Sequence, residues 1–79
     1  MPKMSEKDQK VCEEIINDFL DSGDYRVPDG MTVDDFCEVV PMLVNKSAKK
    51  IMRRKTFTEL GEWEISEIYR DVMEYLYDE

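Results

Sequence analysis

Histidine is absent from the 79 residues, and this absence excludes more chemistry than any other feature of the composition. Histidine is the commonest general acid–base group and the commonest metal ligand. Helical di-metal centres also depend on Glu-x-x-His pairs. A chain this short has, in addition, little room for a substrate pocket of ~300 Å³ or more. We therefore expect a protein that is not an enzyme and that holds no metal and no cofactor.

Cysteine is scarce, and long apolar runs are missing. Cys12 and Cys37 lie 25 residues apart without a CxxC motif, so they match no metal or redox site. Both fall on apolar helix faces, and we expect both to be buried with reduced thiols. The first residues lack the apolar core of a signal peptide, and no segment approaches a ~20-residue membrane span. These features predict a cytoplasmic protein that does not bind membranes.

What the sequence does contain is helical periodicity, beginning with residues 6–21. Ser5 is a suitable N-cap, and Asp8, three residues later, is placed to accept from the free amides of the first turn. Gly23 is suited to end the helix. The apolar positions follow one helical face, namely Val11, Cys12, Ile15, Ile16, Phe19 and Leu20.

A loop of about nine residues, 23–31, follows and contains the turn signal Pro28-Asp29-Gly30. A helix–loop–helix with Asp and Gly suggests an EF-hand, which the register excludes. With Gly30 at loop position 6, the ligand positions 1, 3 and 12 fall on Tyr25, Val27 and Phe36, none of which is a carboxylate.

The second helical segment spans residues 33–54 and contains Pro41. Thr32 is the expected N-cap, and the inward positions are Val33, Phe36, Cys37, Val40, Val44, Ala48, Ile51 and Met52. Proline removes an amide donor and crowds the carbonyl four residues earlier. The sequence allows either one kinked helix or two helices that meet at Pro41.

The last helix is predicted over residues 62–77, after a further capping pattern at 56–59. We expect Phe57 and Trp63 to pack over its N-terminal end. Its core stripe is Ile65, Ile68, Tyr69, Val72 and Leu76. The fold class is therefore all-α: a single domain over residues 1–79, built as a small bundle of three to four helices, with residues 1–4 disordered.

Positive charge is concentrated in one segment of an otherwise acidic chain. Six of the eleven Lys and Arg residues lie between Lys46 and Lys55, which leaves five positive and nineteen negative charges elsewhere, a remainder of −14. Five of them share one helix face, which we call the basic stripe: Lys46, Lys49, Lys50, Arg53 and Arg54. Such a face is either a solvated surface that pairs with carboxylates or a phosphate-contacting helix.

The last helix carries the complementary acidic stripe, with steps of three and four residues: Glu64, Glu67, Asp71, Glu74 and Asp78. Carboxylates spaced by ~4.5–6 Å along a helix are close to the spacing of phosphates on a nucleic-acid strand. The stripe is therefore either a mimic of nucleic acid or a face that keeps the protein in solution. Two neighbouring tyrosines, Tyr75 and Tyr77, point away from the centre of the core stripe, and we expect at least one to be exposed, as at protein interfaces.

These patterns predict a small, acidic protein-binding module, an adaptor or inhibitor, that docks its last helix on a basic partner protein and mimics nucleic acid in doing so. The alternative is a nucleic-acid-binding regulator that uses the basic stripe. A third possibility is a homo-oligomer in which the basic helix of one copy pairs with the acidic helix of another.

Overall fold

The computed structural model describes residues 5–54 and 60–77, with the exception of the Arg54 side chain. The described chain forms three α-helices and no strands, in the order α1 (Glu6–Asp21), α2 (Val33–Arg54) and α3 (Glu62–Tyr77). This confirms the predicted all-α class and all three helical ranges. The expected disorder of residues 1–4, the capping pattern at 56–59 and the packing of Phe57 concern residues outside the described ranges.

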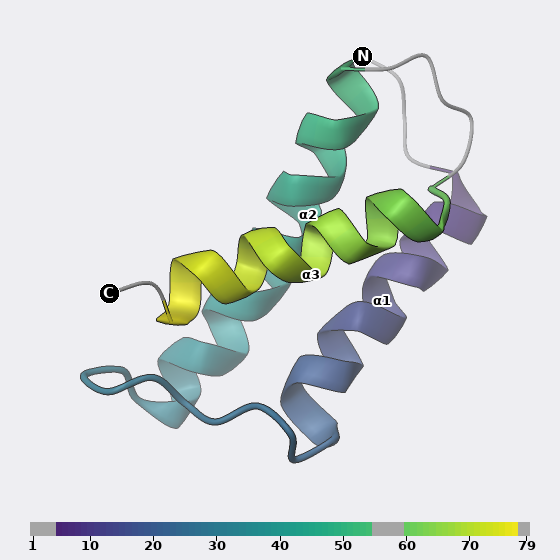
Figure 1. Ribbon diagram of the computed structural model, residues 1–79. Helices are drawn as coiled ribbons and strands as arrows, with labels where there is room; N and C mark the ends of the chain where they lie inside the picture. The colour runs from purple at the N-terminus through teal and green to yellow at the C-terminus, as the bar shows by residue number, and fades with distance from the viewer. Residues whose placement is uncertain (1–4, 55–59, 78–79) are drawn as a thin grey trace.

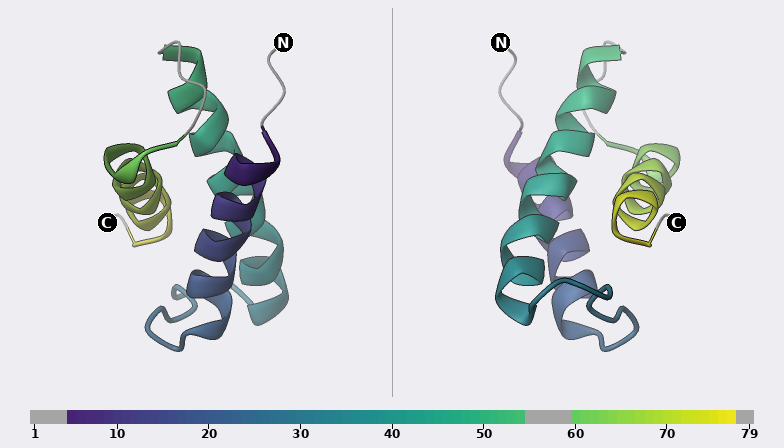
Figure 2. Two further views of the ribbon diagram at one scale, coloured as in Figure 1. Left: turned by 90° about the vertical axis from the view of Figure 1, so that its right-hand side faces the viewer. Right: turned by 90° about the vertical axis from the view of Figure 1, so that its left-hand side faces the viewer.

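The three helices form two layers. α1 and α2 run antiparallel beside one another, and α3 crosses in front of both (Figure 1). Seen from the side, α3 occupies one face of the α1–α2 pair, and no described helix covers the opposite face (Figure 2). α2 is the central helix, because it packs against both of the others.

α1 begins and ends where its local signals predict. The Ser5 hydroxyl accepts a 3.1 Å hydrogen bond from the Asp8 amide, which satisfies one of the free donors of the first turn. At the other end Gly23 has φ +79°, the left-handed conformation that follows a helix C-terminus and that glycine adopts without steric cost.

The connection between α1 and α2 covers residues 22–32 and is one residue longer at each end than predicted. The Met31 amide donates to the Pro28 carbonyl over 3.1 Å, and Gly30 takes φ +85° within this turn. Positive φ at the third position of a turn favours glycine. The turn predicted from Pro28-Asp29-Gly30 is therefore present.

α2 is one continuous helix with Pro41 inside it, which decides between the two alternatives that the sequence allowed. It begins at the predicted cap, where the Thr32 hydroxyl accepts from the Asp35 amide over 3.1 Å. Buried side chains continue on one face across the proline, from Phe36 and Val40 to Val44 and Ile51. The packing of this face on both neighbours compensates for the hydrogen bond that proline removes.

α3 begins at a cap that the Glu64 side chain supplies. The Gly61 carbonyl accepts from the Ile65 amide, and the Glu64 carboxylate folds back to accept from the Gly61 amide, each over 2.9 Å. Glu64 stands three residues after Gly61, the spacing of a capping box. A β-carbon added at Gly61 would lie 2.8 Å from this carboxylate oxygen, so the absence of a side chain there leaves room for the cap.

The core consists of the predicted stripes with three corrections. Each helix contributes fully buried residues, such as Phe19, Val40 and Ile68. Val33 and Cys37, predicted to face inward, are exposed, because at this end of α2 the side chain that enters the core is Phe36. Trp63, predicted to cover the start of α3, is 86% exposed. Its position, five residues before Ile68, places it almost opposite the buried side of the helix.

No described helix is long and apolar enough to cross a membrane.

Truncation of Ile68 to alanine should lower the free energy of unfolding by ~2–5 kcal/mol, since the side chain is completely buried between the layers. Urea unfolding followed by circular dichroism measures this change. Trp63→Ala removes a larger side chain from an exposed position and should change stability by less than ~0.5 kcal/mol. Equal losses in the two variants would contradict the assigned core.

Candidate functional site

The acidic stripe is not a uniform solvent-facing row of carboxylates. Glu64 is the capping residue of α3, and Asp71 lies between helices. Glu67 is half-buried and has an interaction partner, whereas Glu74 is exposed. Asp78 lies outside the described residues. Only part of the predicted stripe is therefore available to a partner.

Asp71 connects α3 to α2 through two contacts. One oxygen, Oδ2, accepts a 2.8 Å hydrogen bond from the Ser47 hydroxyl and lies 3.3 Å from the Lys50 ammonium. Ser47 is buried, and Asp71 is 24% exposed. The basic and acidic stripes thus meet within one chain, along the contact between α2 and α3.

The described side chains of the basic stripe are all exposed, namely those of Lys46, Lys49, Lys50 and Arg53. Three of them line two different grooves. Lys46 and Lys50 line a groove of about 320 Å³ toward α3, together with Asp71 and Tyr75. Lys49 lines a different groove, between α2 and α1. The side chain of Arg54 lies outside the described residues.

α3 exposes large apolar side chains at several positions around its axis. Trp63 is 86% exposed, Tyr75 65% and Met73 42%. Tyr77 is half-buried. The expectation that at least one of Tyr75 and Tyr77 is exposed is therefore confirmed. Arg70 and Glu74, one turn apart, are exposed charges on the side of α3 that faces away from the core. We call this set the α3 surface: Trp63, Glu67, Arg70, Met73, Glu74, Tyr75 and Tyr77.

A second feature, the tyrosine groove, lies beside the α3 surface and has a volume of about 720 Å³. Tyr25 from the α1–α2 loop and Asp18 from α1 line it on one side. Side chains from successive turns of α3 line the other side: Ser66, Tyr69, Arg70, Met73, Glu74 and Tyr77. The groove is thus built from the end of α1 and the loop after it on one side and from α3, about 50 residues later, on the other.

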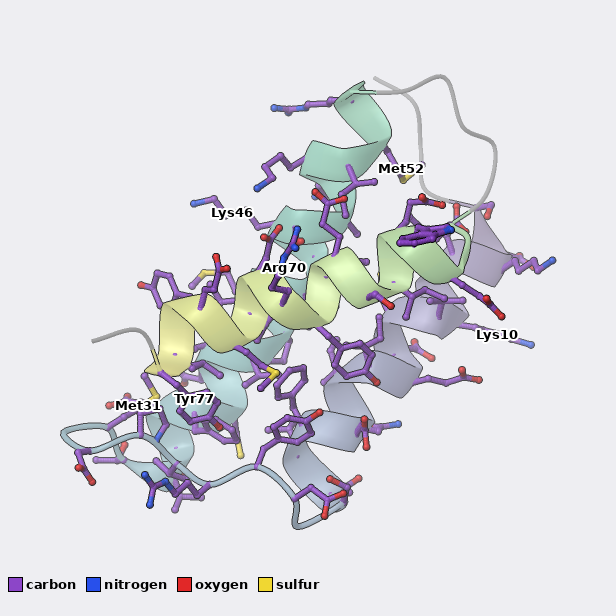
Figure 3. The ribbon with its side chains drawn as sticks, in the orientation of Figure 1. Lys10, Met31, Lys46, Met52, Arg70 and Tyr77 are labelled. Atoms are coloured by element: carbon purple, nitrogen blue, oxygen red, sulfur yellow. The ribbon has the colours of Figure 1, made fainter. Side chains whose placement is uncertain are left out.

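Hydrogen bonds hold two of the three tyrosines in place. The Tyr69 hydroxyl donates to Asp18 Oδ2 over 2.8 Å, and the Tyr77 hydroxyl donates to the Arg26 carbonyl over 2.7 Å. The ring centroids of Tyr25 and Tyr69 lie 4.2 Å and 5.4 Å from that of the buried Phe19. Figure 3 shows Tyr77 beneath α3, close to the loop that carries Met31.

Burial and nearby carboxylates raise the pKa of the tyrosines in the groove. For Tyr69, burial is the largest cause, followed by the hydrogen bond to Asp18, and together they raise the pKa to about 12. Burial, Asp18 and Asp24 raise the pKa of Tyr25. Burial also raises the pKa of Tyr77, against the opposing effect of Arg26. The phenols remain neutral hydrogen-bond donors near neutral pH.

One polar contact in the interior was not predicted. Asp8 is completely buried, and its Oδ1 accepts a 2.9 Å hydrogen bond from the Leu60 amide, 52 residues away. The expectation that this carboxylate accepts hydrogen bonds from the free amides in the first turn of α1 is therefore wrong. Its other oxygen, Oδ2, has no hydrogen-bond partner. The signal was present in the sequence, because Asp8 precedes Cys12 by four residues and lies on the same apolar face.

Sequence reasoning also missed Asp18, Tyr25 and Ser47. Ser47 is three residues from Val44 and four from Ile51, so its position on the buried face was readable. Tyr25 is the one aromatic residue of the loop over residues 22–32, which is a weaker signal. Nothing local distinguishes Asp18 from the other carboxylates of α1.

The two thiols have different environments. Cys12 is buried, and burial, followed by the nearby Asp8 charge, raises its pKa. Cys37 is exposed, contrary to the prediction. Over the described ranges, no three side chains of the Cys, Asp or Glu type converge as metal ligands would.

Comparisons with protein-family models, with curated proteins and with solved structures return no match.

Replacement of Asp8 by alanine should lower the free energy of unfolding by ~1–3 kcal/mol, since it leaves the buried Leu60 amide without an acceptor. Asp8→Asn keeps an acceptor oxygen and should cost less. Asp21→Ala removes an exposed carboxylate from the same helix and serves as the control in urea unfolding. Stability of Asp8→Ala equal to that of the control would contradict the role of this bond.

The raised pKa of Tyr69 predicts a loss of stability at high pH. The folded chain holds this proton up to about pH 12, whereas the ordinary tyrosine value is 10.0. The contribution is therefore complete below about pH 10 and is lost as the pH rises through about 12. Absorbance titration at 295 nm should show a phenol that ionises near pH 12 and that disappears in Tyr69→Phe. Ionisation of all tyrosines near pH 10 would contradict this.

Proposed function

We propose that this chain is a non-enzymatic protein-binding module, an adaptor or inhibitor, that docks the α3 surface on a basic surface of another protein. The observation that carries the proposal is the exposure of Trp63, Tyr75 and Met73 on one helix of a very small domain. Tryptophan and tyrosine are the residues that most often dominate binding energy at protein interfaces. The net charge of −8 favours a partner of opposite sign.

Two carboxylates of the acidic stripe are left out of the docking surface that we propose. Glu64 and Asp71 accept hydrogen bonds within the chain. We assign docking to Glu74 and Asp78, and to Glu67 in addition to its interaction within the chain, with Tyr75 and Tyr77 beside them. Mimicry of nucleic acid would use these fewer carboxylates against a basic groove of the partner. Docking of this kind requires neither a cofactor nor catalysis.

Nucleic-acid binding through the basic stripe is the second candidate, favoured by the exposure of Lys46, Lys49 and Arg53. The contact between Lys50 and Asp71 acts against it, since a carboxylate inside the stripe repels phosphates. The same contact weakens the case for pairing between copies, because the two stripes already meet within one chain.

We place the protein in the cytoplasm. The support for this is the free, exposed thiol of Cys37, which a reducing compartment protects from oxidation.

Charge reversal on the α3 surface tests the proposal. Peptides are selected from a random library displayed on phage by binding to the immobilised full chain, and Glu67→Lys with Glu74→Lys is then compared with the parent chain. We expect the selected peptides to be rich in arginine or lysine and their binding to fall at least ~tenfold in the double variant, because two attractive charges become repulsive.

The matched control is Glu13→Lys with Asp21→Lys, which changes the net charge equally at exposed positions of α1. Equal loss of binding in both double variants would mean that only net charge matters, and it would contradict the proposal.

Nucleic-acid binding is measured separately, by fluorescence polarisation with labelled duplex DNA, single-stranded DNA and RNA. Salt-sensitive binding that Lys46→Glu with Lys49→Glu abolishes would make the nucleic-acid function primary.

A further inference from the structure

We infer that the tyrosine groove receives an arginine side chain of the protein partner. This inference deepens the proposed function and rests on it, because it identifies the side chain by which a basic partner would be recognised. It also extends the binding site beyond α3, to α1 and to the loop between α1 and α2.

The groove presents aromatic rings whose positions are already held by the fold. Tyr69 and Tyr77 direct their hydroxyl groups to Asp18 and to the Arg26 carbonyl. Tyr25 packs against Phe19, which is buried. A ligand that enters the groove therefore meets aromatic surface that needs no reordering, which lowers the entropic cost of binding.

The charges around the groove favour a cation. Asp18 and Glu74 line it, and Asp24 and Glu14 lie close enough to raise the pKa of Tyr25 and of Tyr69, respectively. Two cations oppose these four carboxylates: Arg70, which lines the groove, and Arg26, which is near Tyr77. The surrounding charge is therefore −2. An anionic ligand would be repelled, and a purely apolar one would remove the carboxylates from water without replacing their partners.

A guanidinium group suits this combination better than an ammonium group does. It is planar and weakly hydrated, so it stacks on the face of a tyrosine, and its N–H groups can donate to a carboxylate at the same time. Asp18 accepts from Tyr69 through Oδ2, and its other oxygen is the acceptor that we assign to the arginine. The groove volume of about 720 Å³ exceeds one side chain and accommodates the peptide segment that carries it.

Nuclear magnetic resonance with a small probe tests this inference without the partner. The ¹⁵N-labelled full chain is titrated with N-acetyl-arginine amide and, separately, with N-acetyl-citrulline amide, which has nearly the same shape but no charge. We expect saturable shifts at Asp18, Tyr25, Tyr69 and Tyr77 with the arginine compound only. N-acetyl-lysine amide should bind more weakly, since it lacks the planar fork.

Asp18→Asn supplies the decisive variant, because asparagine can still accept from the Tyr69 hydroxyl but carries no charge. Affinity for the arginine compound should fall about fivefold, and the spectrum itself reports whether the fold is intact. Asp21→Asn, which removes an exposed carboxylate three residues away, is the control. Equal binding of the citrulline compound, shifts outside the groove, or equal effects of the two variants would each overturn the inference.

The arginine site and the α3 docking surface can fail independently of each other. Binding of the arginine compound in the groove, combined with selected peptides that ignore the reversal of Glu67 and Glu74, would leave the groove assigned and remove the α3 docking surface. If the selected peptides require Glu67 and Glu74 but the arginine compound does not bind, the α3 docking surface stands and the assignment of the groove is overturned.

Discussion

The hydrogen bond between Asp8 and the Leu60 amide joins the start of α1 to the start of α3. Leu60 and Gly61 present consecutive backbone amides, and two carboxylates accept from them, Asp8 from α1 and Glu64 from α3 itself. A buried amide without an acceptor is costly, so the position of the chain at this point is strongly determined. This contact holds the start of α3 beside α1. From there α3 crosses the α1–α2 pair, and its core stripe packs against α2.

The position of α3 brings its acidic stripe into contact with the basic stripe of α2. Once α3 lies on α2, the basic and acidic stripes meet at Lys50 and Asp71, which pair beside the buried Ser47. A pair at the protein surface adds little stability on its own. Its larger effect is on function, because it divides each stripe into a part that serves the fold and a part that remains available to a partner. The available part of α3 carries Trp63 and Tyr75, the two most exposed aromatic side chains of the described chain.

The tyrosine groove arises from the same arrangement. α3 and the loop approach from opposite sides, and the bond from Tyr77 to the Arg26 carbonyl closes that end. Tyr25 and Tyr69 both pack on Phe19, so the core of α1 supports the floor of the groove. A protein of 79 residues thereby combines an exposed aromatic helix with an adjacent acidic recess. This combination suits the recognition of a basic protein surface, with shape supplied by the aromatics and selectivity by the carboxylates.

The sequence by itself determined the three helices, their limits and most of the core. Ser5, Thr32 and Gly23 act on their own neighbours, and the spacing of apolar residues reports a helix face without reference to any other element. Only the tertiary structure decided which predicted faces are covered. Cys37 is exposed near the start of α2, Trp63 points away from the core, and Asp8 accepts from an amide 52 residues away in the sequence. Exposure and long-range hydrogen bonds depend on how the helices cross, and that geometry results from the packing of all three faces together rather than from any one of them.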